Sequence, residues 1–97
     1  MTYSFHPEAE AEFLEAIDYY EERAVRLGQD FATEVYSAID RIIAYPQAWP
    51  ILVGPVRRCL TQRFPYGVLY ALEEEHVYIL AIMNLHRGPE YWKQRLR

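Results

Sequence analysis

The sequence predicts an α+β fold in which an N-terminal strand and an antiparallel pair of helices precede a three-stranded antiparallel meander, with all strands in one mixed sheet. Apolar residues recur at helical spacing between residues 7 and 45, and β-branched and aromatic residues dominate residues 56–85. Three prolines and a glycine separate the two regions at residues 46–55. The chain of 97 residues has room for one domain, 1–97, built on one core.

The first elements are a short strand and a long helix. Residues 2–6 alternate polar and aromatic side chains, as a strand with one buried face does. Pro7 suits the first turn of a helix, which we expect to reach about residue 27, with Gly28 as its C-cap. Most acids of this helix are expected on a solvated face: Glu8, Glu10, Glu12, Glu15, Asp18, Glu21 and Glu22.

A second apolar stripe, from Phe31 to Ile43, predicts a second helix. It is expected to end near Tyr45, because Pro46 disfavours helical backbone at the residue before it. Each helix has a single apolar face, so the pair needs a sheet to cover it.

The second half of the chain predicts the sheet. Strands are expected at residues 56–64, 66–73 and 77–85, after a loop at 46–55. The last strand is apolar on both faces, which marks a central position, and the opening strand must join the sheet to satisfy its backbone groups. A short helix is expected after Gly88-Pro89.

Composition and charge restrict the class of protein. The net charge is −4, and it is uneven: residues 1–45 hold ten acids and three bases (−7), whereas residues 46–97 hold four acids and seven bases (+3). We do not expect direct nucleic-acid binding from a chain with this acidic balance. The single cysteine, Cys59, and the absence of a long apolar run lead us to expect a cytoplasmic protein outside the membrane.

Three motifs occur in the order typical of one superfamily. An opening strand leads into a helix that begins at a proline, FPYGVLY (64–70) lies on a middle strand, and HRGPEYW (86–92) follows the last strand. In these features the chain resembles the RelE/ParE superfamily of toxins from bacterial type II toxin–antitoxin pairs, and more closely its ParE branch. The resemblance covers nearly the whole chain and implies a cognate antitoxin as partner.

The ribonuclease-type relatives need a base, an acid and cations that hold the scissile phosphate. The residues that could supply these groups are Arg63, His86, Arg87 and Tyr91. In such relatives an arginine follows the aromatic residue at the start of the middle strand, whereas this chain has Tyr66-Gly67. No confident catalytic residue is therefore assigned, and His86 is better explained as a surface or capping residue at a strand end.

Binding residues are predicted at two places. A surface for the target is expected around the basic and aromatic side chains of the last strands and the tail: Arg57, Arg58, Arg87, Tyr91, Trp92, Lys93 and Arg95. Tyr91 and Trp92 point about 100° apart on a helix, so one of them should be exposed. Arg57 and Arg58 should lie on opposite faces of their strand, where a solvated edge is an equally good explanation. Antitoxin contacts are expected at large aromatic side chains: Tyr20, Tyr45, Trp49 and Trp92.

Three functional hypotheses remain open. The resemblance implies a toxin that binds DNA gyrase and blocks replication without chemistry of its own. The alternatives are a ribosome-dependent mRNA endoribonuclease and a non-toxic module that only binds the antitoxin. No cofactor is expected, and His6, His76 and His86 lie on separate predicted elements without metal-ligand spacing.

Overall fold

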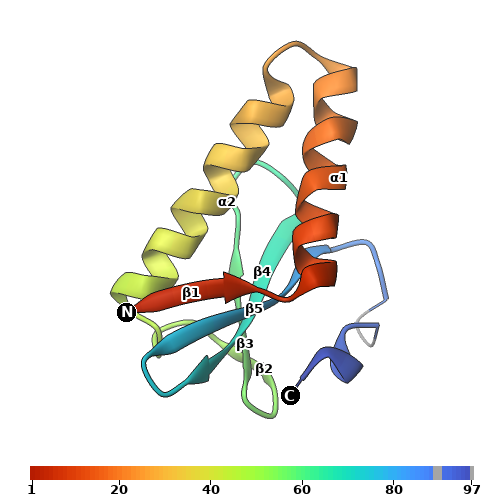
Figure 1. The fold of residues 1–97 in the computed structure, drawn as a ribbon. Coiled ribbons are helices and arrows are strands. Elements are labelled where there is room, and N and C mark those ends of the chain that lie inside the picture. Colours follow the sequence, from red (N-terminus) through yellow and green to blue (C-terminus); the bar gives the residue numbers. More distant parts are fainter. Residues whose placement is uncertain (89–90, 97) are drawn as a thin grey trace.

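Two antiparallel helices cover one face of a five-stranded sheet in the computed structural model, which describes residues 1–88 and 91–96 (Figure 1). The sheet order is β1-β5-β4-β3-β2; β1 runs parallel to β5, and the other neighbours are antiparallel. The predicted α+β fold with one mixed sheet is confirmed. In chain order the elements are β1 (Thr2–Phe5), α1 (Pro7–Arg23), α2 (Leu27–Ala44), β2 (Ile51–Val53), β3 (Val56–Leu60), β4 (Tyr66–Glu73), β5 (His76–Asn84) and one 3₁₀ turn (Lys93–Arg95).

The connection between the two helices differs from the prediction. Helix α1 ends at Arg23 rather than near residue 27, and α2 already begins at Leu27. The carboxylate of Glu21 accepts hydrogen bonds from the backbone N–H groups of Arg26 (3.0 Å) and Gly28 (3.1 Å). An acid of the last turn of α1 therefore caps the start of α2, which breaks the helix earlier than the apolar stripe indicates.

Gly28 does not act as the predicted C-cap of the first helix. It lies in the first turn of α2 and packs directly on α1, where an added Cβ would come within 2.4 Å of the carbonyl oxygen of Ile17. Gly28 is needed because the two helices approach each other closely at this point.

The segment predicted as a loop contains a strand. β2 lies between Pro50 and Pro55 and pairs with β3. Because prolines flank its three apolar residues, the sequence pattern indicated a loop. β3 is shorter than predicted and ends at Leu60 rather than at residue 64. The chain turns there because the carboxylate of Glu34 on α2 accepts hydrogen bonds from the N–H groups of Gln62 (2.8 Å) and Arg63 (3.2 Å).

β4 and β5 are the buried centre of the sheet. β4 has the predicted bounds, and β5 is displaced by one residue from the predicted strand. Leu69 pairs with Ala81 whereas Tyr70 pairs with Ile79, so Leu80 is an extra residue in β5, a β-bulge. Because β5 is apolar on both faces, no alternation in the sequence reveals this shift.

The two faces of the sheet carry separate cores. The helix-side core contains Phe13, Phe31, Ile39 and Tyr70, and the outer face is covered in part by Trp92. The predicted C-terminal helix is only a single 3₁₀ turn at Lys93–Arg95, while Pro89 and Glu90 lie outside the described residues. Isolated short helices are marginal in water, and this segment is held instead by burying individual side chains.

Candidate functional site

On the outer sheet face, Arg58 of β3 packs against Gly67 of β4. A Cβ on residue 67 would lie 3.0 Å from both Cγ and Cδ of Arg58, so the arginine side chain rests on the glycine. Arg58 pairs in register with Leu69, whose side chain belongs to the outer-face core. The position at which ribonuclease-type relatives are expected to carry an arginine is thus covered here by an arginine from the neighbouring strand.

Arg57 lies on the opposite face, as predicted from the alternation of side chains in a strand. It pairs with Tyr70 of the helix-side core, and its Nη1 donates to the backbone carbonyls of Gln47 (3.0 Å) and Trp49 (2.7 Å). Arg57 therefore holds the 46–50 loop against the sheet, which gives it a structural role in the chain itself.

Arg87, Tyr91 and Glu12 form a second cluster beside the end of β5. The Arg87 guanidinium lies 3.9 Å from the centre of the Tyr91 ring, and its Nη1 lies 3.9 Å from Oε2 of Glu12 on α1. Burial raises the pKa of the Tyr91 hydroxyl to about 12, and the negative charge of Glu12 acts in the same direction. Tyr91 is therefore a neutral aromatic surface for the arginine at physiological pH.

Arg95 and Trp92 are interior residues. The Arg95 side chain is 6% exposed and donates to both carboxylate oxygens of Glu12, at 3.0 and 2.9 Å, and to the carbonyl of Leu80 at 3.0 Å. Trp92 is 1% exposed in the outer-face core, while Tyr91 is half-buried. Trp92 and Arg95 thus lie beneath the surface on which a partner was expected to contact them.

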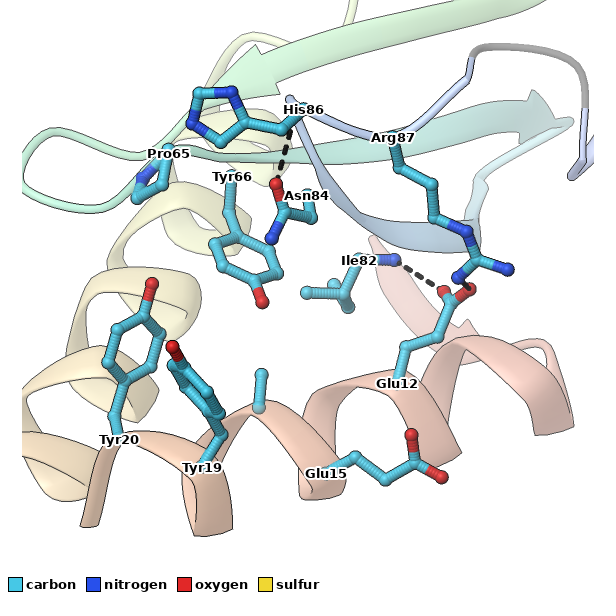
Figure 2. A pocket seen from close by; sticks show the side chains of 11 residues that line it. Glu12, Glu15, Tyr19, Tyr20, Pro65, Tyr66, Ile82, Asn84, His86 and Arg87 are labelled. Atoms are coloured by element: carbon cyan, nitrogen blue, oxygen red, sulfur yellow. Dashed lines mark hydrogen bonds and ion pairs between the residues drawn. The ribbon is translucent and has the colours of Figure 1, made fainter. Parts of the chain in front are cut away.

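Of the four residues named for ribonuclease chemistry, Arg87 and Tyr91 are in contact, whereas Arg63 is turned toward another element. Arg63 lies 3.5 Å from the carboxylate of Asp30 on α2, whereas Arg87 is turned toward Glu12 on α1. Figure 2 shows the imidazole of His86 and the guanidinium of Arg87 at different ends of one groove. The backbone N–H of His86 donates to Oδ1 of Asn84 at 2.9 Å, which fixes the turn after β5 and leaves the His86 side chain exposed.

The groove itself separates α1 from the ends of β4 and β5 and has a volume of about 640 Å³. Figure 2 shows the hydroxyl groups of Tyr20 and Tyr66 directed into it. Burial raises the pKa of both hydroxyls, so both are neutral hydrogen-bonding groups at physiological pH. The groove is lined by Glu12, Glu15, Ala16, Tyr19, Tyr20, Pro65, Tyr66, Ile82, Asn84, His86 and Arg87.

Some kinds of site have no support in the described residues. Within residues 1–88 and 91–96, no three His, Cys, Asp or Glu side chains are placed to hold a metal ion. None of the helices described is long and apolar enough to cross a membrane. Cys59 is buried, and burial raises the pKa of its thiol, which agrees with a packing role.

The comparison that decides the family covers most of the chain. Residues 3–88 match the sequence profile of the ParE toxin of the type II toxin–antitoxin system, parDE. The chain belongs to the ParE toxin family. Among solved structures, this ParE-family toxin resembles a chain of the chromosomal ParDE toxin–antitoxin system from P. aeruginosa, with a TM-score of 0.63 and 18% identity. That similarity covers 88% of this chain and 96% of the other, and it supports the fold. No curated protein sequence matches the chain.

The four aromatic residues expected to contact an antitoxin differ widely in exposure. Tyr45 of this ParE-family toxin is 68% exposed at the end of α2, whereas Trp92 is buried. Trp49 is half-buried and its Nε1 donates to the carbonyl of Arg41 at 3.3 Å. Tyr20 is also half-buried and packs against Phe64, with ring centres 4.8 Å apart. Of the four, Tyr45 has the most accessible ring.

Sequence reasoning missed Glu12, which was grouped with the solvated acids of the first helix. Its side chain is 14% exposed and contacts Arg95 and Arg87. The available signal was its spacing: Ala9 and Ala16, three residues before and four after, are both buried, so Glu12 lies on the inward side of α1. An acid between two small apolar residues at helical spacing indicates a buried partner of opposite charge.

Proposed function

We propose that this ParE-family chain is a toxin that acts by binding DNA gyrase rather than by cutting RNA, and that a cognate antitoxin neutralises it. Membership in the ParE family supports a toxin. The packing of Arg58 over Gly67, at the position where ribonuclease-type relatives carry an arginine, favours gyrase over RNA as its target. Phosphate-cleaving sites need cations and an acid–base pair held at one point. Here Arg63 is paired with Asp30, and His86 and Arg87 lie at different ends of one groove.

A binding surface fits the same observations better. Arg87 keeps 58% of its side chain exposed while it stacks on Tyr91, and Arg58 lies half-buried on the outer sheet face. Rigidly held arginine and aromatic side chains are frequent hot spots of protein–protein interfaces. We assign the target surface to Arg58, Arg87 and Tyr91, with Lys93 at its border. Trp92 and Arg95 are buried and support this surface from beneath. Arg57 is not part of it, since it holds the 46–50 loop against the sheet.

The antitoxin is proposed to cover exposed apolar side chains away from the target surface. Such side chains occur on both helices and along β2: Leu14, Tyr19, Val25, Tyr36, Tyr45, Ile51, Leu52 and Val53. Large exposed apolar surface on a small domain is typical of an interaction site. A segment that folds on binding could follow the helix pair and reach β2.

The test compares gyrase with mRNA as the target. Purified toxin should inhibit DNA supercoiling by gyrase and increase double-strand breaks, and added antitoxin should abolish both effects. Arg87→Ala should weaken the effect on gyrase by about tenfold or more, as loss of a hot-spot arginine does. Arg63→Ala is the matched control, because it removes an exposed arginine that contacts α2.

An effect on transcripts would contradict this assignment. If induction of the toxin arrests growth and yields cut mRNA on translating ribosomes, and if His86→Ala restores growth, the ribonuclease hypothesis is correct. If expression causes no growth defect although the antitoxin still binds, the chain is an antitoxin-binding module.

A further inference from the structure

The edge of β5 is covered by a strand along only part of its length. β1 pairs with β5 from Thr2 opposite His76 to Phe5 opposite Ile79, and the N–H of His6 then donates to the carbonyl of Ile79 at 2.8 Å. Pro7 turns the chain away into α1 at this point. Among the described residues, the edge beyond Ile79 therefore lacks a strand neighbour, and its backbone groups need other partners.

Two side chains take the place of the missing strand. Nη1 of Arg95 donates to the carbonyl of Leu80, the bulge residue, at 3.0 Å, and Oε1 of Glu12 accepts from the N–H of Ile82 at 3.1 Å. The same two side chains are joined by two hydrogen bonds of 3.0 and 2.9 Å. The pair thus offers one donor and one acceptor to the strand edge, as a neighbouring strand would.

These backbone contacts require the acid at position 12 and the arginine at position 95. Glu12 is the acceptor for an N–H group and Arg95 is the donor to a carbonyl, so the two residues cannot be exchanged without leaving both backbone groups unsatisfied. Both side chains are largely removed from water, with 14% and 6% exposure. The closest charged partner of each is therefore the other, since Glu8 lies farther from Arg95 (3.8 Å) and Arg87 lies farther from Glu12 (3.9 Å).

The same carboxylate also orders the residues at the surface. Oε2 of Glu12 lies 3.9 Å from Nη1 of Arg87, and the Tyr91 ring lies 3.9 Å from the Arg87 guanidinium and 5.1 Å from that of Arg95. Glu12 thus contacts both the buried and the exposed arginine, and Tyr91 packs against both. Fixing Arg95 in place also fixes the geometry of Arg87 and Tyr91.

We propose that Glu12 is a positioning residue: through Arg95 it latches the C-terminal segment 91–96 onto the free edge of β5 and so presents Arg87 and Tyr91 in the arrangement that the target recognises. The effect on toxicity rests on the target surface proposed above. The latch itself is a property of the folded chain and is measured without any target.

The latch is tested in a Trp49→Phe background, in which Trp92 is the only tryptophan. In Glu12→Ala we expect amide exchange of Ile82 to accelerate by at least about tenfold, while amides at the centre of β4 keep their protection. Acrylamide quenching of Trp92 should increase several-fold. Glu12→Gln keeps an acceptor for Ile82 but loses the charge, so it should expose Trp92 with a smaller change at Ile82. Glu10→Gln, on the exposed side of the same helix, should change neither.

The exchanged pair Glu12→Arg with Arg95→Glu separates a strand-edge latch from a simple ion pair. We expect no rescue, because an arginine at position 12 cannot accept from the N–H of Ile82 and a glutamate at position 95 cannot donate to the carbonyl of Leu80. Full recovery of Ile82 protection and Trp92 shielding would overturn the latch, as would a shielded Trp92 in a folded Glu12→Ala variant.

Growth arrest at matched protein levels is the functional measurement, because it assumes no particular target. Glu12→Gln should relieve arrest about as strongly as Arg87→Ala, and Glu10→Gln should not. If Trp92 is released while arrest persists, Glu12 does not position the target surface. If arrest is relieved but gyrase is unaffected by the parent toxin, the positioning role stands and the gyrase target fails.

Discussion

The aliphatic part of Arg58 covers Gly67 on the outer face of the sheet, so closely that a methyl group on residue 67 would lie 3.0 Å from two of its carbons. This contact connects β3 with β4 at the position where an active-site arginine would otherwise be expected. It also makes the orientation of the Arg58 guanidinium depend on the absence of a side chain at residue 67.

Gly67→Ala should therefore weaken toxicity without unfolding the protein. The Arg58 side chain is flexible and can move aside, so we expect the free energy of unfolding to change by less than about 1 kcal/mol. Growth arrest should fall as it does in Arg58→Ala, and the double variant should show no further loss, since both changes remove the same contact. If Gly67→Ala remains fully toxic while Arg58→Ala is inactive, the prediction is wrong.

Gly28→Ala should destabilise the helix pair. The added methyl group would come within 2.4 Å of the Ile17 carbonyl oxygen and 2.9 Å of Cβ of Glu21, so the helices must separate. We expect a loss of about 1 to 3 kcal/mol in the free energy of unfolding, the usual range for overpacking. Urea unfolding gives this value, and Gly88→Ala is the control because, apart from its chain neighbours, no atom of the described residues lies within 4 Å of its added Cβ.

Tyr45 and Trp92 should have opposite phenotypes, although both were predicted as antitoxin contacts. Trp92→Ala removes a buried ring and should cost about 3 to 5 kcal/mol of stability. Tyr45→Ala removes an exposed ring, so stability should be retained while the dissociation constant for the cognate antitoxin rises by about tenfold, as expected for an aromatic anchor. Calorimetric titration and thermal unfolding measure the two effects. Unchanged antitoxin affinity in Tyr45→Ala would remove this residue from the interface.

Stability should decrease at alkaline pH because of Tyr70. Its hydroxyl donates to the carbonyl of Pro46 at 2.7 Å, and burial raises its pKa to about 12 from the ordinary value near 10. The folded state retains this proton where the unfolded chain has released it, so the contribution of Tyr70 to stability is complete below about pH 10 and is lost as the pH rises through about 12. Tyr70→Phe should flatten this part of the profile and lower stability at neutral pH by about 1 kcal/mol, the worth of one hydrogen bond.

Urea unfolding at several values between about pH 8 and pH 11.5 measures the profile, since this range spans the ordinary pKa of tyrosine. Tyr45→Phe is the control, because its ring is exposed and makes no comparable contact within the described chain. If the stability of Tyr70→Phe falls with rising pH as steeply as that of the parent protein, other groups control alkaline unfolding. Tyr91, whose pKa is also raised to about 12, is the first of these to examine.

The fold could be predicted from the sequence where local pattern determines local structure. β4 has the predicted bounds from Tyr66 to Glu73 because prolines, aromatic residues and an acidic turn define both ends. Helix α2 stops before Pro46 for a similarly local reason. The motifs around Gly67 and His86 were sufficient to indicate the superfamily, which the match over residues 3–88 confirms.

What the sequence did not show depends on segments that meet only in the folded chain. Gly28 resembles a helix terminator until Ile17 is placed beside it, and Glu12 resembles one more surface acid until Arg95 is placed against it from the other end of the chain. Periodicity reports which side of an element is buried and not what covers it. The same reason made Trp92 a candidate for exposure, since the outer face that it covers cannot be read from its neighbours.

The parallel pairing of β1 with β5 has a consequence for synthesis. Thr2 can pair only after His76, 74 residues further along the chain, has been made. At about 5 to 20 residues/s, translation of that interval takes about 4 to 15 s, and Arg95 is added later still. Until then β1 has no strand to pair with, and the C-terminal segment 91–96 has not been made. A nascent chain of this toxin therefore cannot form the proposed target surface before residues 91–96 have been added.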